Sequence, residues 1–595
     1  MPRDRSLASV AIVAALAVLA APRPAAAATH TITWDRYSLM IDGQRTFVWS
    51  GEFHPFRLPS PSLWRDELQK LKAHGYNAVS IYFNWGYHSP ARGVYDFTGV
   101  RDMDQVLALA QEVGLYVIAR PGPYINAEVD GGGFPGWLAT VTGKARTDAA
   151  AYLAATDEWQ SQIDAVLARH QLTAGTGTVI LYQIENELAS TGSSQLNYMT
   201  HLRNKARSDG ITVPIFHNDK GRNGIWVPAG GGISGTVVGP VDLYAFDGYP
   251  GGTCHSDNTT GGPSVAPDWG IWSTGGATGG ASASPTTPGF AAEFGGGWFD
   301  FWGGSGSYPC MSQREGPGYE RVFYGTNIAN RLTIQNFYMT VGGTSWGWLA
   351  APVVYTSYDY GAAFDEGRHP RAKAETMKEL GLMLQSVPAL AKLDPGAAVT
   401  PSSSAVKVYH DVNPDTQAHV YVATHSPSSA TTTDSFTFPI TTPDGTFSAA
   451  LDLAGQDAKI LLANLDFGGQ HLVFSTSEIE TIARQDAGDL LVLYGRTNEP
   501  GETVLRYASQ PTVTVLAGTV SSAFSNGQLD LDYTHSALAQ VRITGGGRDP
   551  LMLLIARQTI ADTMWRQDTA AGPVVERGPA LVRTAQATGS TLALT

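Results

Sequence analysis

The sequence predicts an α/β protein in which a (β/α)8 TIM barrel is followed by an antiparallel, sandwich-like β domain. Two observations predict the barrel. In the first 390 residues, short runs rich in β-branched residues alternate with amphipathic helical stretches, and eight such runs can be counted. Several of these runs end in acidic or amide residues, as strands of such barrels do where they carry chemistry. One observation predicts the second domain: after residues 386–404 the hydrophobic period becomes two.

The eight predicted strands are short and largely apolar. They are Phe47–Phe53, Ala78–Phe83, Tyr116–Pro121, Thr178–Asn186, Pro214–Asn218, Leu243–Tyr249, Gly289–Phe294 and Thr344–Leu349. The predicted helices are Ser62–His74, Val100–Val113, Ala150–His170, Ser193–Asp209, Tyr319–Val341 and Arg371–Gln385. Pro61 and Ser62 start the first helix and Gly75 stops it, while Gly114 ends the second. The Gly-rich stretch 221–288 predicts long loops, which usually form functional walls or lids.

The first 28 residues have the pattern of a secretion signal. Arg3 and Arg5 precede an apolar run from Leu7 to Ala21, and four alanines, Ala25–Ala28, offer a cleavage site. No later stretch is long and apolar enough to span a bilayer. We therefore expect a soluble, secreted protein, extracellular or periplasmic, that begins near Thr29.

The remaining chain divides into three parts. The barrel is predicted over residues 29–390 and the β-rich second domain over 391–580. Strands of this second domain are predicted at Val406–His410, Ala418–Thr424, Ser435–Ile440, Ile460–Leu465, His471–Ser475, Leu490–Tyr494 and Ala539–Ile543. Residues 581–595 are expected to begin a further, truncated β segment, because the chain stops at Leu592–Thr595 in what has the pattern of a strand.

Charge and cysteine content exclude some classes of partner. The formal net charge is −14, which argues against a nucleic-acid or anionic-membrane surface and favours a neutral partner. The only two cysteines, Cys254 and Cys310, predict a disulfide in an exported chain rather than a metal site or a reactive thiol. The fourteen histidines show no HExxH or paired Cys/His spacing, so no metal site and no cofactor is predicted. Nothing in the sequence indicates the oligomeric state.

Two glutamates stand at the ends of strands that face each other across the predicted barrel. Glu187 follows Asn186 at the end of the fourth strand, and Glu293 ends the seventh. Cleavage of a glycosidic bond usually takes two carboxyl groups, one to donate a proton and one to attack the anomeric carbon or activate water. The placement of Glu187 and Glu293 therefore predicts glycoside hydrolysis, with the sugar between them.

Other acidic residues compete for these roles. Glu185 lies two residues before Glu187, so simple alternation would point both side chains to one side of the strand. We expect Glu185 to lie deeper and to form a structural hydrogen-bonding network. Glu128, Glu52 and Asp247 are candidates for holding sugar hydroxyls rather than for proton chemistry.

Several segments resemble motifs of the glycoside hydrolase family 35 β-galactosidases. They are Gly51–Pro59, Ser80–Trp85, Ala119–Glu128, Gln183–Glu187 and Glu293–Asp300. The resemblance covers about residues 33–390, and the following β region resembles the second domain of the large, multidomain fungal-type members. Those members continue with C-terminal domains that this chain lacks. Ser89 stands where the family usually has Glu, a position that varies in the fungal type.

The resemblance implies a retaining exo-β-galactosidase that releases terminal, non-reducing β-D-galactose from oligosaccharide or polysaccharide ends by double displacement. It assigns the acid/base role to Glu187 and the nucleophile to Glu293. The galactose pocket would be lined by Tyr82, Asn126, the backbone of Ala127, Glu128 and Asn186, and closed by Tyr249 and Tyr358. Cys254 and Cys310 match a disulfide of the family.

Three alternatives remain open at the level of sequence. A related retaining exo-glycosidase would act on β-glucosamine or β-galactan ends. A secreted carbohydrate-binding homologue would have lost catalysis, against which the presence of both Glu187 and Glu293 argues. An inactive fragment is the third alternative, because the C-terminal domains are absent.

Overall fold

The computed structural model describes residues 29–232, 236–250, 284–303, 308–485, 487–588 and 591–595, together with Cys254 and Ala266. The predicted signal peptide, 1–28, lies outside the described residues, as does most of the Gly-rich segment 251–283.

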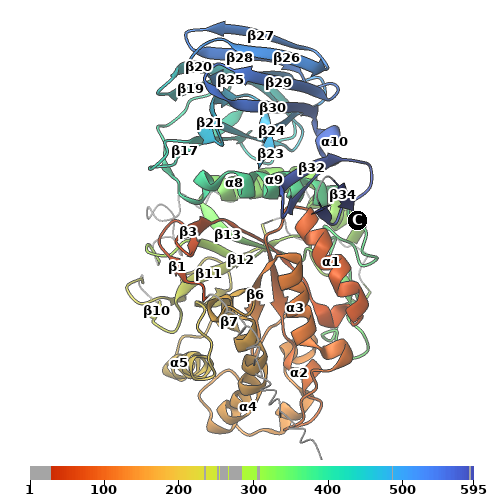
Figure 1. Cartoon of the computed structure of the whole chain (residues 1–595). Coiled ribbons are helices and arrows are strands. Elements are labelled where there is room, and N and C mark those ends of the chain that lie inside the picture. Colours follow the sequence, from red (N-terminus) through yellow and green to blue (C-terminus); the bar gives the residue numbers. More distant parts are fainter. Residues whose placement is uncertain are drawn as a thin grey trace, which may run out of the picture.

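Eight parallel strands close the predicted barrel, which forms the lower half of the molecule in Figure 1. In chain order they are β4 (Val48–Glu52), β5 (Ala78–Tyr82), β6 (Tyr116–Arg120), β7 (Val179–Asn186), β8 (Ile215–Asp219), β11 (Leu243–Gly248), β12 (Gly289–Gly295) and β13 (Leu332–Tyr338). Pairing of β13 with β4 completes the ring. Nearly every residue of these strands is buried, which explains their continuous apolar sequence.

The amino end of the barrel is filled with apolar side chains. A small antiparallel sheet, β1 (Ile32–Trp34), β2 (Leu39–Ile41) and β3 (Gln44–Thr46), lies against it. Leu39 and Ile41 of this sheet pack into one cluster with Val48, Ile118 and Ile334 of the barrel strands. The polar residues of the strands therefore gather at the opposite, carboxyl end.

The prediction of the eighth strand at Thr344–Leu349 is wrong. That segment contributes only the two-residue β14 (Gly343–Thr344), and its Trp346 and Trp348 are exposed. The true strand, β13, was hidden in the predicted helix Tyr319–Val341, which instead divides into α8 (Pro317–Ala329) and β13. Arg331 makes the turn between α8 and β13 with a φ of 63°. This left-handed conformation is uncommon for residues other than Gly, and the segment between the two elements contains no Gly or Pro that would predict a turn.

The other predicted barrel helices are confirmed to within a few residues. They are α1 (Pro61–Ala73), α3 (Met103–Val113), α4 (Ala150–Leu167), α5 (Ser193–Ser208) and α9 (Ala372–Ser386). Asp102 caps α3 by accepting a 2.9 Å hydrogen bond from the Gln105 amide, and Gly114 ends it with a φ of 81°. Among the described helices, none has the length and hydrophobicity that crossing a membrane requires.

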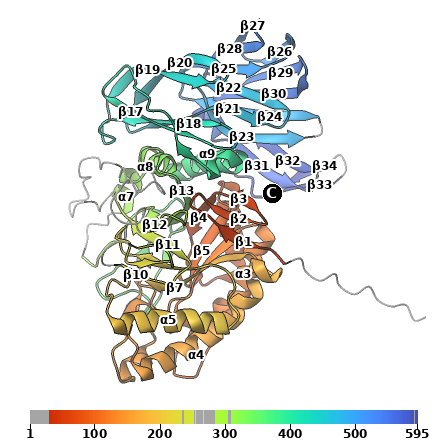
Figure 2. The same cartoon turned by 90° about the vertical axis from the view of Figure 1, so that its left-hand side faces the viewer.

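The C-terminal half is built of sheets that stack on α8 and α9, as both views show (Figures 1 and 2). An eight-stranded sheet has the order β16-β17-β18-β21-β22-β25-β28-β27, and a five-stranded sheet has the order β23-β24-β30-β29-β26. The strands of these two sheets are β16 (Asp394–Pro395), β17 (Val406–Val412), β18 (His419–His425), β21 (Ala458–Phe467), β22 (Gln470–Ser475), β23 (Glu478–Gln485), β24 (Gly488–Gly495), β25 (Pro500–Arg506), β26 (Pro511–Ala517), β27 (Val520–Ser525), β28 (Gln528–Thr534), β29 (Ala539–Gly545) and β30 (Arg548–Arg557). The pairing is antiparallel, as predicted, except that β24 runs parallel to β30.

Two-stranded hairpins complete this half. They are β19 (Thr433–Thr442) with β20 (Gly445–Ala454), β31 (Met564–Thr569) with β32 (Gly572–Arg577), and β33 (Ala585–Thr588) with β34 (Thr591–Leu594). The last residues of the chain thus form a strand that pairs with β33.

Buried ion pairs join the barrel to the sheets. Arg321 of α8 contacts Glu379 of α9, and it lies 3.1 Å from Glu478 of β23. It also donates a 2.9 Å hydrogen bond to the Tyr494 hydroxyl of β24. Removing one member of such a buried network typically costs about 3–5 kcal/mol, because the remaining charge loses its partner.

The predicted disulfide is present. Cys254 and Cys310 are bonded, with their Cα atoms 6.2 Å apart. Cys310 lies in the short helix α7 (Tyr308–Arg314) rather than in a loop. The bridge ties the chain after β11 to the segment that follows β12.

Candidate active site

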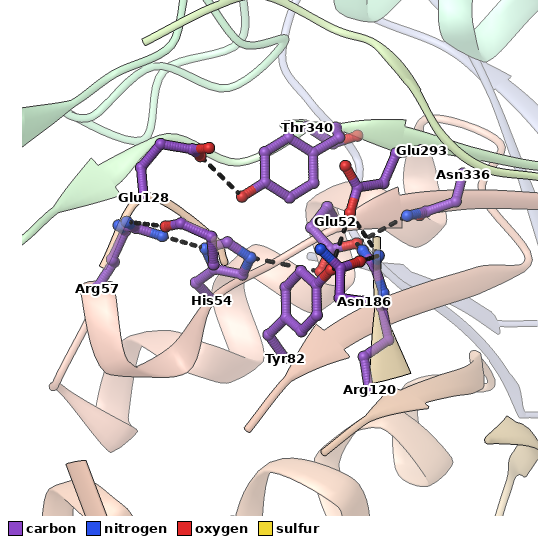
Figure 3. A network of polar contacts seen from close by, with 12 residues as sticks. Glu52, His54, Arg57, Tyr82, Arg120, Glu128, Asn186, Glu293, Asn336 and Thr340 are labelled. Carbon is purple, nitrogen blue, oxygen red and sulfur yellow. Dashed lines mark hydrogen bonds and ion pairs between the residues drawn. The ribbon is translucent and has the colours of Figure 1, made fainter. Parts of the chain in front are cut away.

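The residues predicted for the site come together at the carboxyl end of the barrel. They belong to the ends of β5, β7 and β12 and to the segments that follow β6, β11 and β13. Direct contacts connect many of them. Figure 3 shows polar contacts that lead from Arg57 through His54 and Glu52 to Arg120, and from there to Glu293 and Asn186. Glu128 lies beside these residues.

Glu293 is buried and is held by three donors. Its Oε1 accepts hydrogen bonds from Arg120 and, at 2.8 Å, from the Tyr82 hydroxyl, and its Oε2 accepts one from the Tyr249 hydroxyl. Burial raises the pKa of Glu293; Arg120 opposes this shift, and the nearby charge of Glu187 adds to it. The carboxyl group is therefore fixed in position but is not strongly stabilised as an anion.

Arg120 is the central cation of the site. It is fully buried, lies 3.0 Å from Glu52 and donates a 2.7 Å hydrogen bond to Gln183. Its guanidinium also stacks over the ring of Tyr82 at 3.8 Å. Arg120 therefore connects Glu293 to the interior of the barrel.

Glu52, a candidate for holding a sugar hydroxyl, lies in the interior and contacts other side chains of the barrel. Its side chain is fully buried, and it accepts a 2.7 Å hydrogen bond from Asn336 in addition to its contact with Arg120. Burial acts to raise the pKa of Glu52, but the charge of Arg120 and a contact with His54 outweigh it and hold the pKa at about 2. Glu52 is the fixed counter-charge beneath the site.

The side-chain amide of Asn186 has a defined orientation. Its Oδ1 accepts from the Tyr82 hydroxyl at 2.8 Å, Asn218 at 3.0 Å and Gln183 at 3.2 Å. Because all three groups are donors, the amide atom of Asn186 that faces them is the oxygen. Among the described residues, none accepts a hydrogen bond from the Asn186 amide nitrogen, so that group is left for a ligand oxygen.

Glu187 lies just beyond β7 with a φ of 50°, so its direction does not follow the alternation of the strand. Its neighbour is Asp247, which pairs in register with Glu293 across β11 and β12 and hydrogen-bonds the Glu187 side chain. Burial, followed by this bond and the charge of Glu187, raises the pKa of Asp247 to about 10. Asp247 therefore holds a proton more readily than an ordinary aspartate, and its Oδ1 accepts a 2.8 Å hydrogen bond from the Gly221 amide.

Glu185 has the structural role expected of it. Both of its carboxylate oxygens accept from Arg146, at 2.9 and 2.7 Å, and its side chain is fully buried. Glu185 is therefore a buried ion-pair partner of Arg146.

The segment that carries Glu128 has an unusual backbone. Asn126, Ala127 and Glu128 have consecutive φ values of 54°, 51° and 47°. Such conformations cost of the order of 1–3 kcal/mol each for residues other than Gly and concentrate at functional sites. Arg57 holds the turn by donating a 2.5 Å hydrogen bond to the Ala127 carbonyl.

The Glu128 side chain faces two tyrosines. It accepts hydrogen bonds from the hydroxyl of Tyr358 and, at 3.3 Å, from that of Tyr338. Burial raises the pKa of Glu128 to about 7, although the bond from Tyr358 opposes the shift. Glu128 and Tyr358 are thus in contact, whereas Tyr249 contacts Glu293 on the other side of the site.

Sequence reasoning gave no individual role to Arg57, Arg120, Tyr338 and Asn336. Arg120 had a signal, because an arginine that ends a buried apolar strand needs acidic partners. Tyr338 and Asn336 were hidden because their strand was predicted as helix. In the part of the chain that the structure describes, no group of three or more His, Cys, Asp and Glu side chains could hold a metal ion.

Comparison with protein families agrees with this geometry. The model of glycosyl hydrolases family 35 matches residues 38–384, and that of β-galactosidase domain 2 matches residues 390–561. The chain belongs to glycosyl hydrolases family 35.

The chain is similar to several curated fungal proteins. "Probable beta-galactosidase C" of Aspergillus niger is 36% identical over 95% of this chain and 57% of its own length, and that of Aspergillus fumigatus is 38% identical over 84% and 53%. "Probable beta-galactosidase B" of Sclerotinia sclerotiorum is 37% identical over 95% and 58%. The chain spans about half the length of these relatives. A solved β-galactosidase from Rahnella sp. R3 covers 59% of this chain and 58% of its own with 13% identity and a TM-score of 0.39, too distant to bear on function.

Proposed function

We propose that this chain is a secreted, retaining exo-β-galactosidase that removes terminal, non-reducing β-D-galactose. One observation carries the proposal: Glu187, just beyond β7, and Glu293, in β12, lie close enough for the charge of Glu187 to act on the pKa of Glu293. Retaining glycosidases hold two such carboxyl groups about 5–5.5 Å apart. The names of the fungal relatives support galactose as the sugar.

In the first step Glu293 attacks the anomeric carbon as a carboxylate. A bond forms between its oxygen and that carbon, the bond to the leaving oxygen breaks, and Glu187 gives its proton to the leaving oxygen. Arg120, Tyr82 and Tyr249 hold the attacking group in place. Because the charge of Glu293 disappears in this step, Glu187 can remain as a carboxylate.

In the second step water replaces the enzyme on the sugar. Glu187 takes a proton from the water, whose oxygen bonds to the anomeric carbon, and Glu293 leaves as a carboxylate. Asp247, which hydrogen-bonds the Glu187 side chain, keeps Glu187 in position for this proton transfer. Two inversions retain the anomeric configuration.

The remaining residues bind galactose in this proposal. The free amide nitrogen of Asn186 donates to the sugar 2-hydroxyl, a contact that strengthens in the transition state. Glu128 and the Asn126–Ala127 backbone bind further hydroxyls, positioned by Arg57 and Tyr358. Tyr249 closes the pocket beside Glu293.

Two substitutions test the assignment of roles. Glu293→Gln removes the nucleophile and should abolish turnover of every galactoside. Glu187→Gln should still be galactosylated by an aryl galactoside with a good leaving group, but it should then stall. Azide, which needs no base, should release β-galactosyl azide from that variant.

Glu112→Gln, at an exposed position of α3, is the matched control and should behave as the wild type. Full activity of Glu187→Gln on lactose would refute its role. Release of α-galactosyl azide would show that the enzyme inverts. Sequencing the amino terminus of the exported protein would test the predicted cleavage before Thr29.

A further inference from the structure

The backbone of Glu187 has an unusual conformation that needs support from its surroundings. Its φ of 50° lies in the left-handed region. Residues other than Gly keep such a conformation only where the surrounding structure imposes it, and these residues concentrate at functional sites. The partners of the two peptide groups that flank the Glu187 Cα atom therefore decide where its carboxyl group points.

Both of these peptide groups are anchored by residues of β8. On the amino side, the Glu187 amide donates a 2.8 Å hydrogen bond to the Asn218 carbonyl. On the carboxyl side, the Leu188 amide donates a 3.0 Å hydrogen bond to Nε2 of His217. The Leu188 carbonyl, one peptide group further, accepts a 2.5 Å hydrogen bond from the indole nitrogen of Trp226. Because the first contact restricts φ of Glu187 and the second restricts its ψ, together they fix the direction of the side chain.

The contact with Leu188 defines the tautomer of His217. A backbone amide can only donate, so Nε2 carries no proton and the proton lies on Nδ1. Nδ1 donates to Oδ1 of Asp219 at 2.8 Å. The other carboxylate oxygen, Oδ2, accepts a 2.6 Å hydrogen bond from the Ile225 amide. Asp219 therefore holds His217 in the one tautomer that can accept from the Leu188 amide.

We call His217, Asp219 and Trp226 the peptide clamp. Trp226 begins β9 (Trp226–Val227), and its ring meets that of His217 edge-on at 6.0 Å. All three side chains are buried, so water cannot replace a hydrogen bond that one of them loses. In the part of the chain that the structure describes, none of the three makes a hydrogen bond or a ring contact with Glu293. The peptide clamp thus acts on the Glu187 side of the site alone.

We propose that the peptide clamp positions the Glu187 carboxyl group for proton transfer. His217 and Trp226 act through the backbone of Leu188, and Asp219 acts through the tautomer of His217. The proposal rests on the proposed acid/base role of Glu187 and adds the residues that position it. Without the clamp, Glu187 relaxes to a negative φ and its carboxyl group moves away from the leaving oxygen, while Glu293 keeps its own hydrogen bonds.

The dependence of kcat/KM on the leaving group tests this assignment. Methyl β-galactoside needs a proton on its leaving oxygen, whereas dinitrophenyl β-galactoside releases a stable anion and needs none. His217→Leu removes the acceptor of the Leu188 amide. Its kcat/KM should fall about 100-fold on methyl β-galactoside and less than about threefold on dinitrophenyl β-galactoside. Trp226→Phe keeps a ring and loses only the N–H donor, so its loss on methyl β-galactoside should be about tenfold.

A further variant tests the tautomer. In Asp219→Asn the Ile225 amide keeps the side-chain oxygen on its own side, so the amide nitrogen faces His217. The ring proton must then move to Nε2, where it opposes the Leu188 amide. Asp219→Asn should therefore show the same selective loss as His217→Leu, about 100-fold on methyl β-galactoside only. Wild-type rates in this variant would overturn the assigned tautomer.

Controls separate positioning from general damage to the fold. His535 of the sheet region is also buried, with both ring nitrogens hydrogen-bonded, so His535→Leu is the matched control. Per folded molecule, it should cleave both galactosides at the wild-type rate. His217→Gln offers an oxygen to the Leu188 amide and should recover most of the loss. Equal losses on both galactosides, or no loss on either, would overturn the proposal, and Trp226→Phe carries the same comparison should His217→Leu fail to fold.

A second measurement distinguishes failure of this inference from failure of the proposed function. If the wild type cleaves neither galactoside, the proposed function fails. Hydrogen exchange of the Leu188 amide, followed by mass spectrometry, then tests the peptide clamp directly. Faster exchange in His217→Leu than in the wild type and in His535→Leu supports the clamp, and equal exchange in all three proteins refutes it.

Discussion

At the barrel mouth Arg120 contacts Glu52 and Glu293, and between the barrel and the sheets Arg321 contacts Glu379 and Glu478. In each cluster an almost fully buried arginine joins two glutamates from different elements. The pKa of Glu293 is raised by burial, which Arg120 does not cancel. Burial acts in the same direction on Glu478, but its cationic neighbours lower the pKa below the usual value.

The balance of neighbouring charges accounts for this difference. Around Glu478, Arg496 at 2.7 Å and Lys459 add to Arg321. Around Glu293 the further neighbours are acidic, since Glu187 and Glu52 both raise its pKa. The same chemical groups therefore make a permanent anion at the interface and a more reactive carboxyl group at the barrel mouth.

Removing the arginine of the site should have the largest effect. Arg120→Met leaves Glu52 and Glu293 buried without their shared cation, so the pKa of Glu293 should rise further. We expect kcat/KM to fall by about 100- to 1,000-fold, the usual effect of losing one preorganised charge. The acidic limb of its pH profile should also move to higher pH, because Glu293 must be ionised to attack.

That pH shift distinguishes a positioning role from a structural one. The free energy of unfolding should fall by about 3–5 kcal/mol as well. The folded fraction is therefore measured by CD, and the activity is divided by it. Arg120→Lys keeps a charge and should recover part of the rate. A lower rate with an unmoved acidic limb would mean that Arg120 acts only on packing.

Removing the arginine of the interface should act on stability instead. Arg321→Met leaves Glu379 without its ion pair and weakens the support of Glu478, and we expect a loss of about 3–5 kcal/mol in urea unfolding. The kcat/KM of the molecules that remain folded should stay within about twofold of the wild type. A large fall in kcat/KM with unchanged stability would break the comparison, because the interface would then be coupled to the site.

A feature of the fold or the site could be predicted from the sequence where a short stretch of the chain carries a recognisable pattern. The barrel, Glu187, Glu293 and the disulfide were accessible because apolar runs that end in polar residues, and a lone pair of cysteines, are local patterns. β13 was not accessible, since α8 passes into it through Arg331 without Gly or Pro. β27 was missed because most of its residues are exposed and show no apolar alternation.

The electrostatic states of the site were not accessible either. Asp247 and Glu52 both end barrel strands in similar sequence settings, yet their pKa values are about 10 and about 2. The difference comes from residues distant in the chain: Glu187 faces Asp247, whereas Arg120 faces Glu52. These neighbours are set by the closure of the eight-stranded barrel, which the sequence around each residue does not show.

Substitution of Asp247 should have an effect of intermediate size, on both stability and activity. Because its pKa is about 10 in the folded protein and near 4 in the unfolded chain, only the folded state holds its proton between these values. Folding stability from this group is therefore present at low pH and is lost as pH rises. Asp247→Asn cannot ionise, so its stability relative to the wild type should increase steadily from pH 5 to pH 9.

Thermal unfolding at several pH values measures this trend, and Asp452→Asn, at an exposed position of β20, is the matched control. The Asp247→Asn variant should also lose about tenfold in kcat/KM, because an amide donor replaces the hydroxyl next to Glu187. If the stability of this variant relative to the wild type does not depend on pH, Asp247 is ionised in the folded protein, and its assignment as a protonated carboxyl group is wrong.

Tyr338 should give the smallest effect and tests the missed strand. Its hydroxyl lies 3.3 Å from Glu128 and 3.0 Å from the Tyr358 hydroxyl, so it supports a carboxylate that Tyr358 already contacts and that we propose binds the sugar. Tyr338→Phe removes one long hydrogen bond, worth about 0.5–1.5 kcal/mol, and should raise KM about two- to tenfold with little change in kcat. Tyr358→Phe, which removes the shorter contact, should raise KM further. An equal fall in kcat for both variants, with KM unchanged, would place these tyrosines on the reacting groups rather than on the bound sugar.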